Sequence, residues 1–136
     1  MYPNEEDKQV IVLFRINKAI ETFDQISELV RLKYFNLTVN RLYFAAYYAV
    51  SALLLANNIF ANTHTGASLL FNRYFGKTGK VDAALTKHYG RLLNLRITGD
   101  YSDNYNLDET DVLPMIEPTK KLINAVSLMA KQQVGL

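Results

Sequence analysis

The sequence predicts an all-α protein, an up-and-down bundle of about five helices formed as a single domain over residues 1–136. Residues 42–56 are apolar except for Ser51. This run is too long for one buried strand, and its Ala and Leu content favours helix. Apolar residues recur every three to four positions along the other segments, and no stretch alternates at period two for long enough to form a convincing strand.

The apolar run predicts a central helix over residues 40–58. A helix that is apolar on nearly every side is usually surrounded by other helices. The run is also shorter than the about 20 apolar residues of a comfortable membrane span. Asn57 and Asn58 are expected to end the helix, because Asn tolerates the left-handed backbone conformation found there. Before it, a polar break is expected over residues 36–38, with either Asn36 or Thr38 as the N-cap.

Four further helices are expected over residues 5–34, 63–75, 82–98 and 108–131. Three of them begin at short polar side chains that cap helices well, namely Thr63, Asp82 and Asp108. Asp108 and Asp111 together resemble a capping box. Gly99 is expected to end the fourth helix. Pro114 and Pro118 should make the last helix start late or kink, since proline lacks the amide hydrogen that a helix interior needs.

Composition excludes several classes of site. The chain has no Cys and two His, so disulfides and thiolate metal sites are impossible, and we expect no metal and no cofactor. Fifteen basic and thirteen acidic residues give a net charge of +2, which is too balanced to prove a nucleic-acid partner. The polar, acidic N-terminus has no signal-peptide core, so the expected location is the cytoplasm, without a membrane partner.

The Gly76-Lys77-Thr78 segment looks like the end of a phosphate-binding loop. The full pattern requires a glycine where Phe71 stands, and it requires a preceding strand where a helix is predicted. A glycine-rich helix end with a solvated lysine is therefore the preferred interpretation.

Two groups of residues on the central helix have a possible role in binding. Tyr43, Tyr47 and Ser51 share one face, where core packing is favoured over a base-stacking platform. Asn40 and Arg41 stand at the start of the apolar run. A guanidinium there needs a carboxylate, carbonyl or phosphate partner, so an internal ion pair and an anion site are both open.

A second candidate site lies at the end of the fourth predicted helix. Arg96 falls in its last turn, with Asp100 and Tyr101 just beyond. Arg96 and Asp100 can form a structural i,i+4 pair, which the residues alone slightly favour. Alternatively, Arg96 holds a phosphate while Tyr101 donates a hydroxyl or stacks on a base. His64 is a further candidate for proton transfer near pH 7, although capping or solvation is commoner at such a position.

Three segments in order resemble the HEPN domain family, and within it the small single-domain prokaryotic members. They are NRLYFAAYYAVSALLLANN, THTGASLLFNRYFGKTGKVD and LLNLRITGDYSD, and the resemblance runs from about residue 36 to 126. It implies a helical bundle that usually dimerises and works beside a minimal nucleotidyltransferase, often as toxin and antitoxin. It also implies that active members are metal-independent ribonucleases, which carry an Arg, then four to six other residues, and then a His.

The chain departs from that ribonuclease motif. Arg96 matches the arginine, but Tyr101 stands five positions later, and no His follows Arg96. A phenol with a pKa near 10 is a poor base at pH 7. The resemblance also suggests that a tyrosine near the motif is adenylylated, for which Tyr101 and Tyr105 are the candidates.

Together these observations predict a HEPN-like module that binds a nucleotide or RNA and works with a nucleotidyltransferase partner in a toxin–antitoxin-like system. Catalysis is not favoured, because Tyr101 stands where the ribonuclease motif has a His. The expected binding residues are Asn40, Arg41, Arg96, Asp100 and Tyr101. One alternative is an endoribonuclease toxin that uses Arg96 with Tyr101 or His64. The other is a non-catalytic scaffold for dimerisation, in which the polar cluster only braces helices.

Overall fold

The computed structural model describes residues 3–101 and 106–136, without the side chains of Asp100 and Tyr101. The described residues form six α-helices and one short π-helix, and they contain no strand. The elements are α1 (Glu5–Phe23), α2 (Ile26–Arg31), α3 (Phe35–Ala56), α4 (His64–Phe71), η1 (Asn72–Gly76), α5 (Ala83–Tyr101) and α6 (Glu109–Gln133). The predicted all-α bundle is confirmed.

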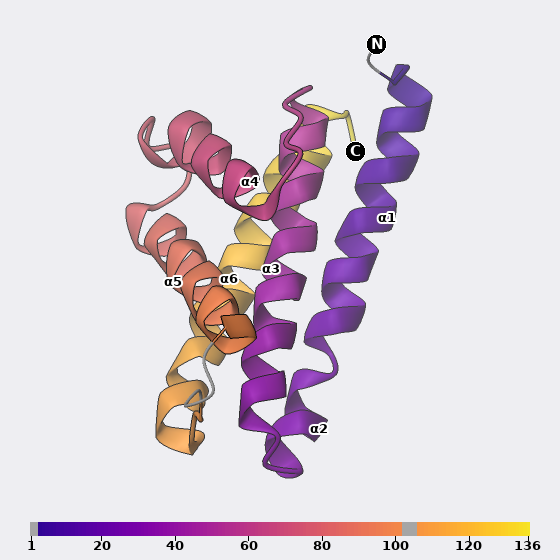
Figure 1. Cartoon of the computed structure of the whole chain (residues 1–136). Helices are drawn as coiled ribbons and strands as arrows, with labels where there is room; N and C mark the ends of the chain where they lie inside the picture. Colours follow the sequence, from indigo (N-terminus) through magenta and orange to yellow (C-terminus); the bar gives the residue numbers. More distant parts are fainter. Residues whose placement is uncertain (1–2, 102–105) are drawn as a thin grey trace.

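Helix α3 is the centre of the bundle, as its apolar sequence predicts. The chain runs down α1, up α3, down α5 and up α6, with α4 lying across one end (Figure 1). Helices α1 and α6 make the most extensive contacts with α3. Helix α3 is the one described helix whose length and composition would suit a membrane span. However, 67% of its most apolar stretch is buried inside the protein. That burial is typical of a core helix.

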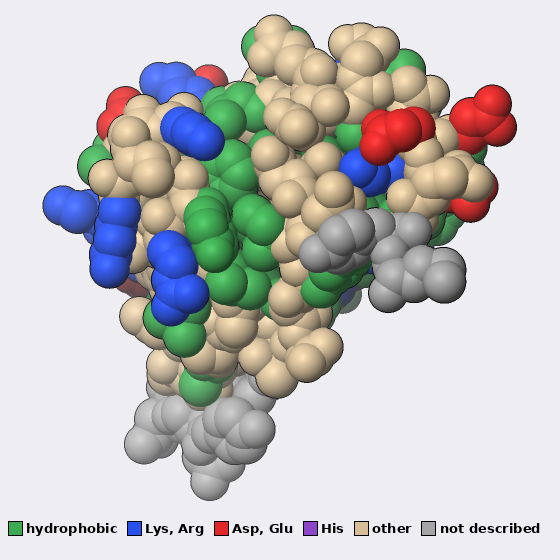
Figure 2. All heavy atoms as spheres, turned by 90° about the horizontal axis from the view of Figure 1, so that it is seen from above, with side chains coloured by type: hydrophobic (Ala, Val, Ile, Leu, Met, Phe, Trp, Pro, Cys, Tyr) green, Lys and Arg blue, Asp and Glu red, His purple; other side chains and the backbone are tan. Residues whose placement is uncertain are grey.

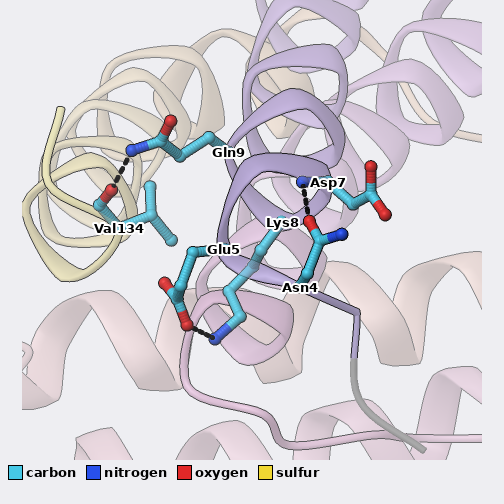
Figure 3. Close-up of polar contacts among 6 residues, drawn as sticks. All are labelled: Asn4, Glu5, Asp7, Lys8, Gln9 and Val134. Carbon is cyan, nitrogen blue, oxygen red and sulfur yellow. Dashed lines mark hydrogen bonds and ion pairs between the residues drawn. The ribbon is translucent and has the colours of Figure 1, made fainter.

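Helix α1 covers one side of α3 and is tied to the far end of the chain. The Asn4 side chain caps it by accepting a hydrogen bond from the Asp7 amide at 2.8 Å. The Gln9 side chain donates to the Val134 carbonyl just beyond α6 at 2.6 Å, and Lys8 pairs with Glu5 at 3.2 Å (Figure 3). The Gln9–Val134 bond joins the two ends of the chain at one end of the bundle.

The prediction of one helix over residues 5–34 is wrong, because the chain breaks at Asp24 and Gln25 into two helices, α1 and α2. The Thr22 hydroxyl donates to the Lys18 carbonyl at 2.7 Å, a contact that often bends a helix. The Gln25 amide then bonds to the Thr22 carbonyl, which tightens the turn.

The predicted break over residues 36–38 is also misplaced. Helix α3 begins at Phe35, and the chain turns two residues earlier, at Lys33, which has a left-handed φ of 62°. Asn36 is not the N-cap; its side-chain oxygen instead accepts a hydrogen bond from the Leu107 amide at 2.8 Å. Thr38 donates back to the Tyr34 carbonyl.

The remaining helix ends mostly follow the prediction. Asn57 is the C-cap of α3, and Asn58 has the expected left-handed φ, at 58°. Thr63 caps α4, and the Asp82 carboxylate accepts from the Ala84 amide at the start of α5. Gly76 is the last residue of η1, so Lys77 follows a helix and not a strand, as expected from the rejection of a phosphate-binding loop.

Two details of the last two helices differ from the prediction. Helix α5 does not end at Gly99 but continues to Tyr101. Asp108 and Asp111 form the predicted capping box. However, α6 starts directly after Asp108 and includes both Pro114 and Pro118, so the expected late start is wrong.

Candidate functional site

Four of the predicted site residues lie around one group of aromatic rings, where α3, α4 and α5 meet. We call this group the Arg96 cluster; it consists of Asn40, Arg41, Tyr43, Phe44, His64 and Arg96. Arg96 comes from the last third of α5, and His64 is the first residue of α4. The Thr63 side chain caps α4 by accepting from the Gly66 amide at 2.8 Å, which fixes the position of His64.

The two guanidinium groups of the cluster lie against aromatic rings of α3. The guanidinium carbon of Arg96 is 5.5 Å from the ring centre of Tyr43 and 5.4 Å from that of Phe44. The guanidinium carbon of Arg41 is 5.0 Å from the Phe44 ring. Attraction between a cation and the ring face holds both groups in place. Phe44 therefore draws two positive charges toward the same site.

The Arg41 guanidinium is held by a neutral side chain. Its Nε and Nη2 atoms donate to the Asn40 side-chain oxygen at 3.2 and 3.1 Å. The ion pairs among the described side chains are Lys8–Glu5 and Arg31–Glu28, and neither involves Arg41. A neutral amide thus orients this guanidinium without neutralising its charge, as an anion site requires.

His64 is bonded to a buried phenol. Its Nδ1 atom lies 2.6 Å from the Tyr43 hydroxyl oxygen. Burial raises the pKa of Tyr43 to about 12, although the Tyr89 hydroxyl and the Arg96 charge oppose the rise. Burial, and then the Arg96 charge, lower the pKa of His64 below its usual value. At neutral pH, therefore, a protonated phenol faces a neutral imidazole.

We assign the proton of the neutral His64 ring from this pairing. With the Tyr43 phenol as the donor to Nδ1, the hydrogen of His64 lies on Nε2. The Nε2–H group is a hydrogen-bond donor rather than a base. His64 is thus suited to bind an anion beside Arg96, and it is poorly suited to remove a proton.

Two tyrosines of α3, Tyr43 and Tyr47, contact His64, and the sequence alone did not identify these contacts. Tyr43 is fully buried, which confirms its predicted place in the core. Tyr47 is half-buried, and its ring lies 4.3 Å from that of His64. The i,i+4 spacing of the two tyrosines was visible in the sequence, but their contacts with His64 depend on the loop that brings α4 back to α3.

The other predicted site residues are not tested. The side chains of Asp100 and Tyr101 lie outside the described residues, as does Tyr105. The Arg96–Asp100 pair and the roles of the two tyrosines therefore remain predictions. Across the described residues, no three His, Asp or Glu side chains come together in a way that could hold a metal ion. His88 is buried and bonded to Thr119, consistent with a packing role.

Comparison with known proteins decides the family. The model of the HEPN domain matches residues 12–129, which include all of the Arg96 cluster. This chain belongs to the HEPN domain family. The match confirms the resemblance inferred from the sequence.

Three relatives of this HEPN protein bear on its role. A protein of Thermotoga maritima named "UPF0332 protein" is 36% identical over 120 residues, covering 88% of this chain and 91% of its own. A Methanocaldococcus jannaschii protein named "Putative toxin MJ0142" is 31% identical, covering 63% of this chain and 58% of its own. A "UPF0332 protein" of Gloeobacter violaceus is 28% identical, covering 65% of this chain and 71% of its own.

Proposed function

We propose that this HEPN protein is an RNA-binding module of a toxin–antitoxin-like system, and that the Arg96 cluster holds a phosphate of single-stranded RNA. The convergence of Arg96, Arg41 and the Nε2–H group of His64 beside aromatic rings carries the proposal. Guanidinium groups bind phosphate oxygens well, and unstacked bases stack on aromatic side chains, such as the half-buried Phe44. Membership of the family and the toxin name of one relative support the same role.

The distribution of charge supports a polyanionic ligand. Residues 61–99 contain six basic residues and one acidic residue; they are Arg73, Lys77, Lys80, Lys87, Arg91 and Arg96, against Asp82. Figure 2 shows Lys and Arg side chains gathered mainly on the left of this face, hydrophobic side chains in its middle, and a group of Asp and Glu at the right. Such a field attracts RNA, although the net charge of the chain is only +2.

Replacing Arg96 tests the proposed site. We expect Arg96→Ala to weaken binding of a fluorescent single-stranded RNA by about tenfold, because a charge-assisted contact with phosphate is lost. Arg91→Ala on the same helix is the matched control, since Arg91 is exposed and makes no contact with the cluster's rings. We expect it to weaken binding by less than threefold. Equal effects of both variants in fluorescence anisotropy would contradict the site.

The same variants separate binding from a purely structural role. If the cluster only braces helices, as in the scaffold alternative, Arg96→Ala should lower the melting temperature without changing RNA affinity. Thermal unfolding of both variants, followed by circular dichroism beside the RNA titration, distinguishes the two outcomes.

An endoribonuclease is the second candidate, and the position of His64 beside Arg96 favours testing it. In that mechanism Arg96 would stabilise the charge on phosphorus and His64 or Tyr101 would transfer protons, without a metal. In the assigned tautomer Nδ1 accepts from Tyr43 and Nε2 carries the hydrogen, so we expect binding without cleavage. The test is incubation of the purified protein with single-stranded RNA in EDTA. Cleavage that is lost in His64→Ala would overturn this expectation.

We also propose that the protein acts as a homodimer with a nucleotidyltransferase partner in the cytoplasm, as the family resemblance implies. Light scattering after gel filtration tests the dimer.

Co-purification with a small nucleotidyltransferase encoded beside this protein tests the partner. Mass spectrometry of the co-expressed chain tests adenylylation of Tyr101 or Tyr105.

A further inference from the structure

A second site lies on the other side of Tyr47. A cavity of about 180 Å³ opens between α1, α3 and α4, bounded by the loop that follows α3. We call it the Arg15 pocket, and the residues that matter for its chemistry are Arg15, Tyr47, Ser51, Phe60 and Ala67. We propose that the Arg15 pocket binds the nucleobase of a nucleotide whose phosphate is held by the Arg96 cluster. This proposal deepens the proposed function and rests on it.

Arg15 gives the pocket a hydrogen-bonding group that is held in position. Its Nη1 atom donates to the Ser51 carbonyl oxygen at 3.1 Å, which connects α1 to the C-terminal third of α3. This is its one hydrogen bond to the described part of the chain, and a guanidinium has five N–H donors. The remaining donors suit the ring nitrogen and carbonyl acceptors at the edge of a base.

The walls of the pocket suit a flat aromatic ligand. Tyr47 and Phe60 provide two aromatic side chains, and the Phe60 side chain is 50% exposed. Leu54, Leu55 and Ala67 form a buried apolar floor. Bases of single-stranded RNA commonly stack on aromatic side chains and bond to arginine. A purely hydrocarbon ligand would leave the Arg15 charge without compensation.

The size of the pocket and its position divide the nucleotide between two sites. A cavity of about 180 Å³ is smaller than the 300–1,000 Å³ usual for whole ligands, so it suits a single base rather than a complete nucleotide. Tyr47 borders the pocket, and its ring centre is 4.3 Å from that of His64 and 6.1 Å from that of Tyr43. The sugar and phosphate of a bound nucleotide would therefore extend along Tyr47 and His64 toward Arg96.

The test uses ligands that contain one half of the nucleotide. Amide chemical shifts are recorded with ribose 5-phosphate, with each of the four nucleosides, and with the corresponding 5′-monophosphates. We expect at least one nucleoside to shift the amides of Tyr47 and Ala67, and ribose 5-phosphate to shift those around Arg96. The matching 5′-monophosphate should bind at least fivefold more tightly than either half.

Variants assign each half to its site. We expect Arg15→Gln to weaken the 5′-monophosphate at least fivefold and leave ribose 5-phosphate unchanged, whereas Arg96→Ala should weaken ribose 5-phosphate. Lys18→Gln is the matched control, because Lys18 is an exposed cation of α1 outside the pocket. Should Arg15→Gln prove unstable, Phe60→Ala removes one aromatic wall without breaking the bond to Ser51.

The two proposals fail in different ways. Nucleoside binding at Tyr47 without any ribose 5-phosphate binding would contradict the phosphate site and leave the base pocket standing. Binding of ribose 5-phosphate without binding of any nucleoside would overturn the base pocket. An equal loss of ribose 5-phosphate and 5′-monophosphate binding in Arg15→Gln would also overturn it. Binding of N-acetyltyrosinamide in place of nucleosides would also overturn it, because it would indicate an aromatic side chain of a protein partner.

Discussion

At the residue scale, the main feature of this HEPN protein is the bond between the Tyr43 phenol and His64. Both His64 and Arg96 were recognisable as candidates from the sequence, because an imidazole near a helix start and an arginine at a helix end stand out. The site that they share was not recognisable, because it depends on a contact between His64 and the core residue Tyr43, which lies 21 residues earlier in the chain. A hydroxyl in an apolar run gives no signal in the sequence that it faces an imidazole.

We expect Tyr43→Phe to remove the preference of the neutral His64 ring for one tautomer. Without the phenol, Nδ1 loses its donor, and the ring nitrogens should become similar in protonation by ¹⁵N NMR at pH 7.5. In the parent protein, Nδ1 should instead be a clear acceptor and Nε2 protonated. Loss of this part-buried hydrogen bond should also lower the free energy of unfolding by about 1 kcal/mol.

Tyr89→Phe is the matched control for that substitution. The Tyr89 ring is stacked on Tyr43 at 5.9 Å, but its buried hydroxyl makes no hydrogen bond of full geometry within the described residues, only a weaker contact with the Tyr43 hydroxyl. Removing this hydroxyl should therefore change the free energy of unfolding by less than about 0.5 kcal/mol. A loss as large as that of Tyr43→Phe in urea denaturation would contradict the difference between the two hydroxyls.

At the element scale, three helices end in the same way, and only part of this was predictable. Lys33, Asn58 and Gly135 have left-handed φ angles of 62°, 58° and 80°. At each, the following amide bonds back to the carbonyl five residues earlier, as in the Tyr34–Leu29, Ile59–Leu54 and Leu136–Lys131 pairs. The turn at Asn58 was predictable from the sequence, since Asn favours this conformation. The turn at Lys33 was not, because Lys does not favour it, so the helix break was predicted three residues late.

We expect Lys33→Gly to stabilise the protein by about 0.5–1 kcal/mol. Glycine adopts a left-handed φ without the steric cost that lysine bears, and this gain exceeds the added freedom of the unfolded chain. Lys33 is exposed, so little packing is lost. The measurement is the free energy of unfolding from urea denaturation. Lys33→Ala keeps the Cβ atom and is the control; an equal gain in both variants would show that the backbone angle is not the cause.

At the scale of the whole molecule, the apolar pattern of α3 was sufficient to predict the bundle, whereas its electrostatics required the structure. Both histidines are placed where charge is unfavourable. His88 is buried at the contact of α5 and α6, with its Nε2 atom 2.8 Å from the Thr119 hydroxyl. Burial, and then the Arg91 charge, lower the pKa of His88, as burial and Arg96 do for His64. The net charge of +2 gave no sign of either effect.

These two shifts predict that the protein loses stability when the solution becomes mildly acidic. In the unfolded chain both histidines have an ordinary pKa of about 6.5. In the folded protein the pKa is lower, so below about pH 6.5 the unfolded state binds more protons than the folded state. Stability should then be fully present above pH 6.5 and should fall as the pH drops from there toward the lowered pKa values.

Urea denaturation at pH 7.5, 6.5 and 5.5 checks this dependence, and His88→Gln assigns part of it. Glutamine can still donate to Thr119 but does not titrate, so the variant should lose less stability between pH 7.5 and 5.5 than the parent protein. The lowered pKa values of the Glu28 and Asp108 carboxylates act only in more acidic solution, because they lie below the ordinary values of 4.5 and 3.8. A flat profile from pH 7.5 to 5.5 in the parent protein would mean that the folded state admits charged imidazoles, which would contradict the placement of both histidines where charge is unfavourable.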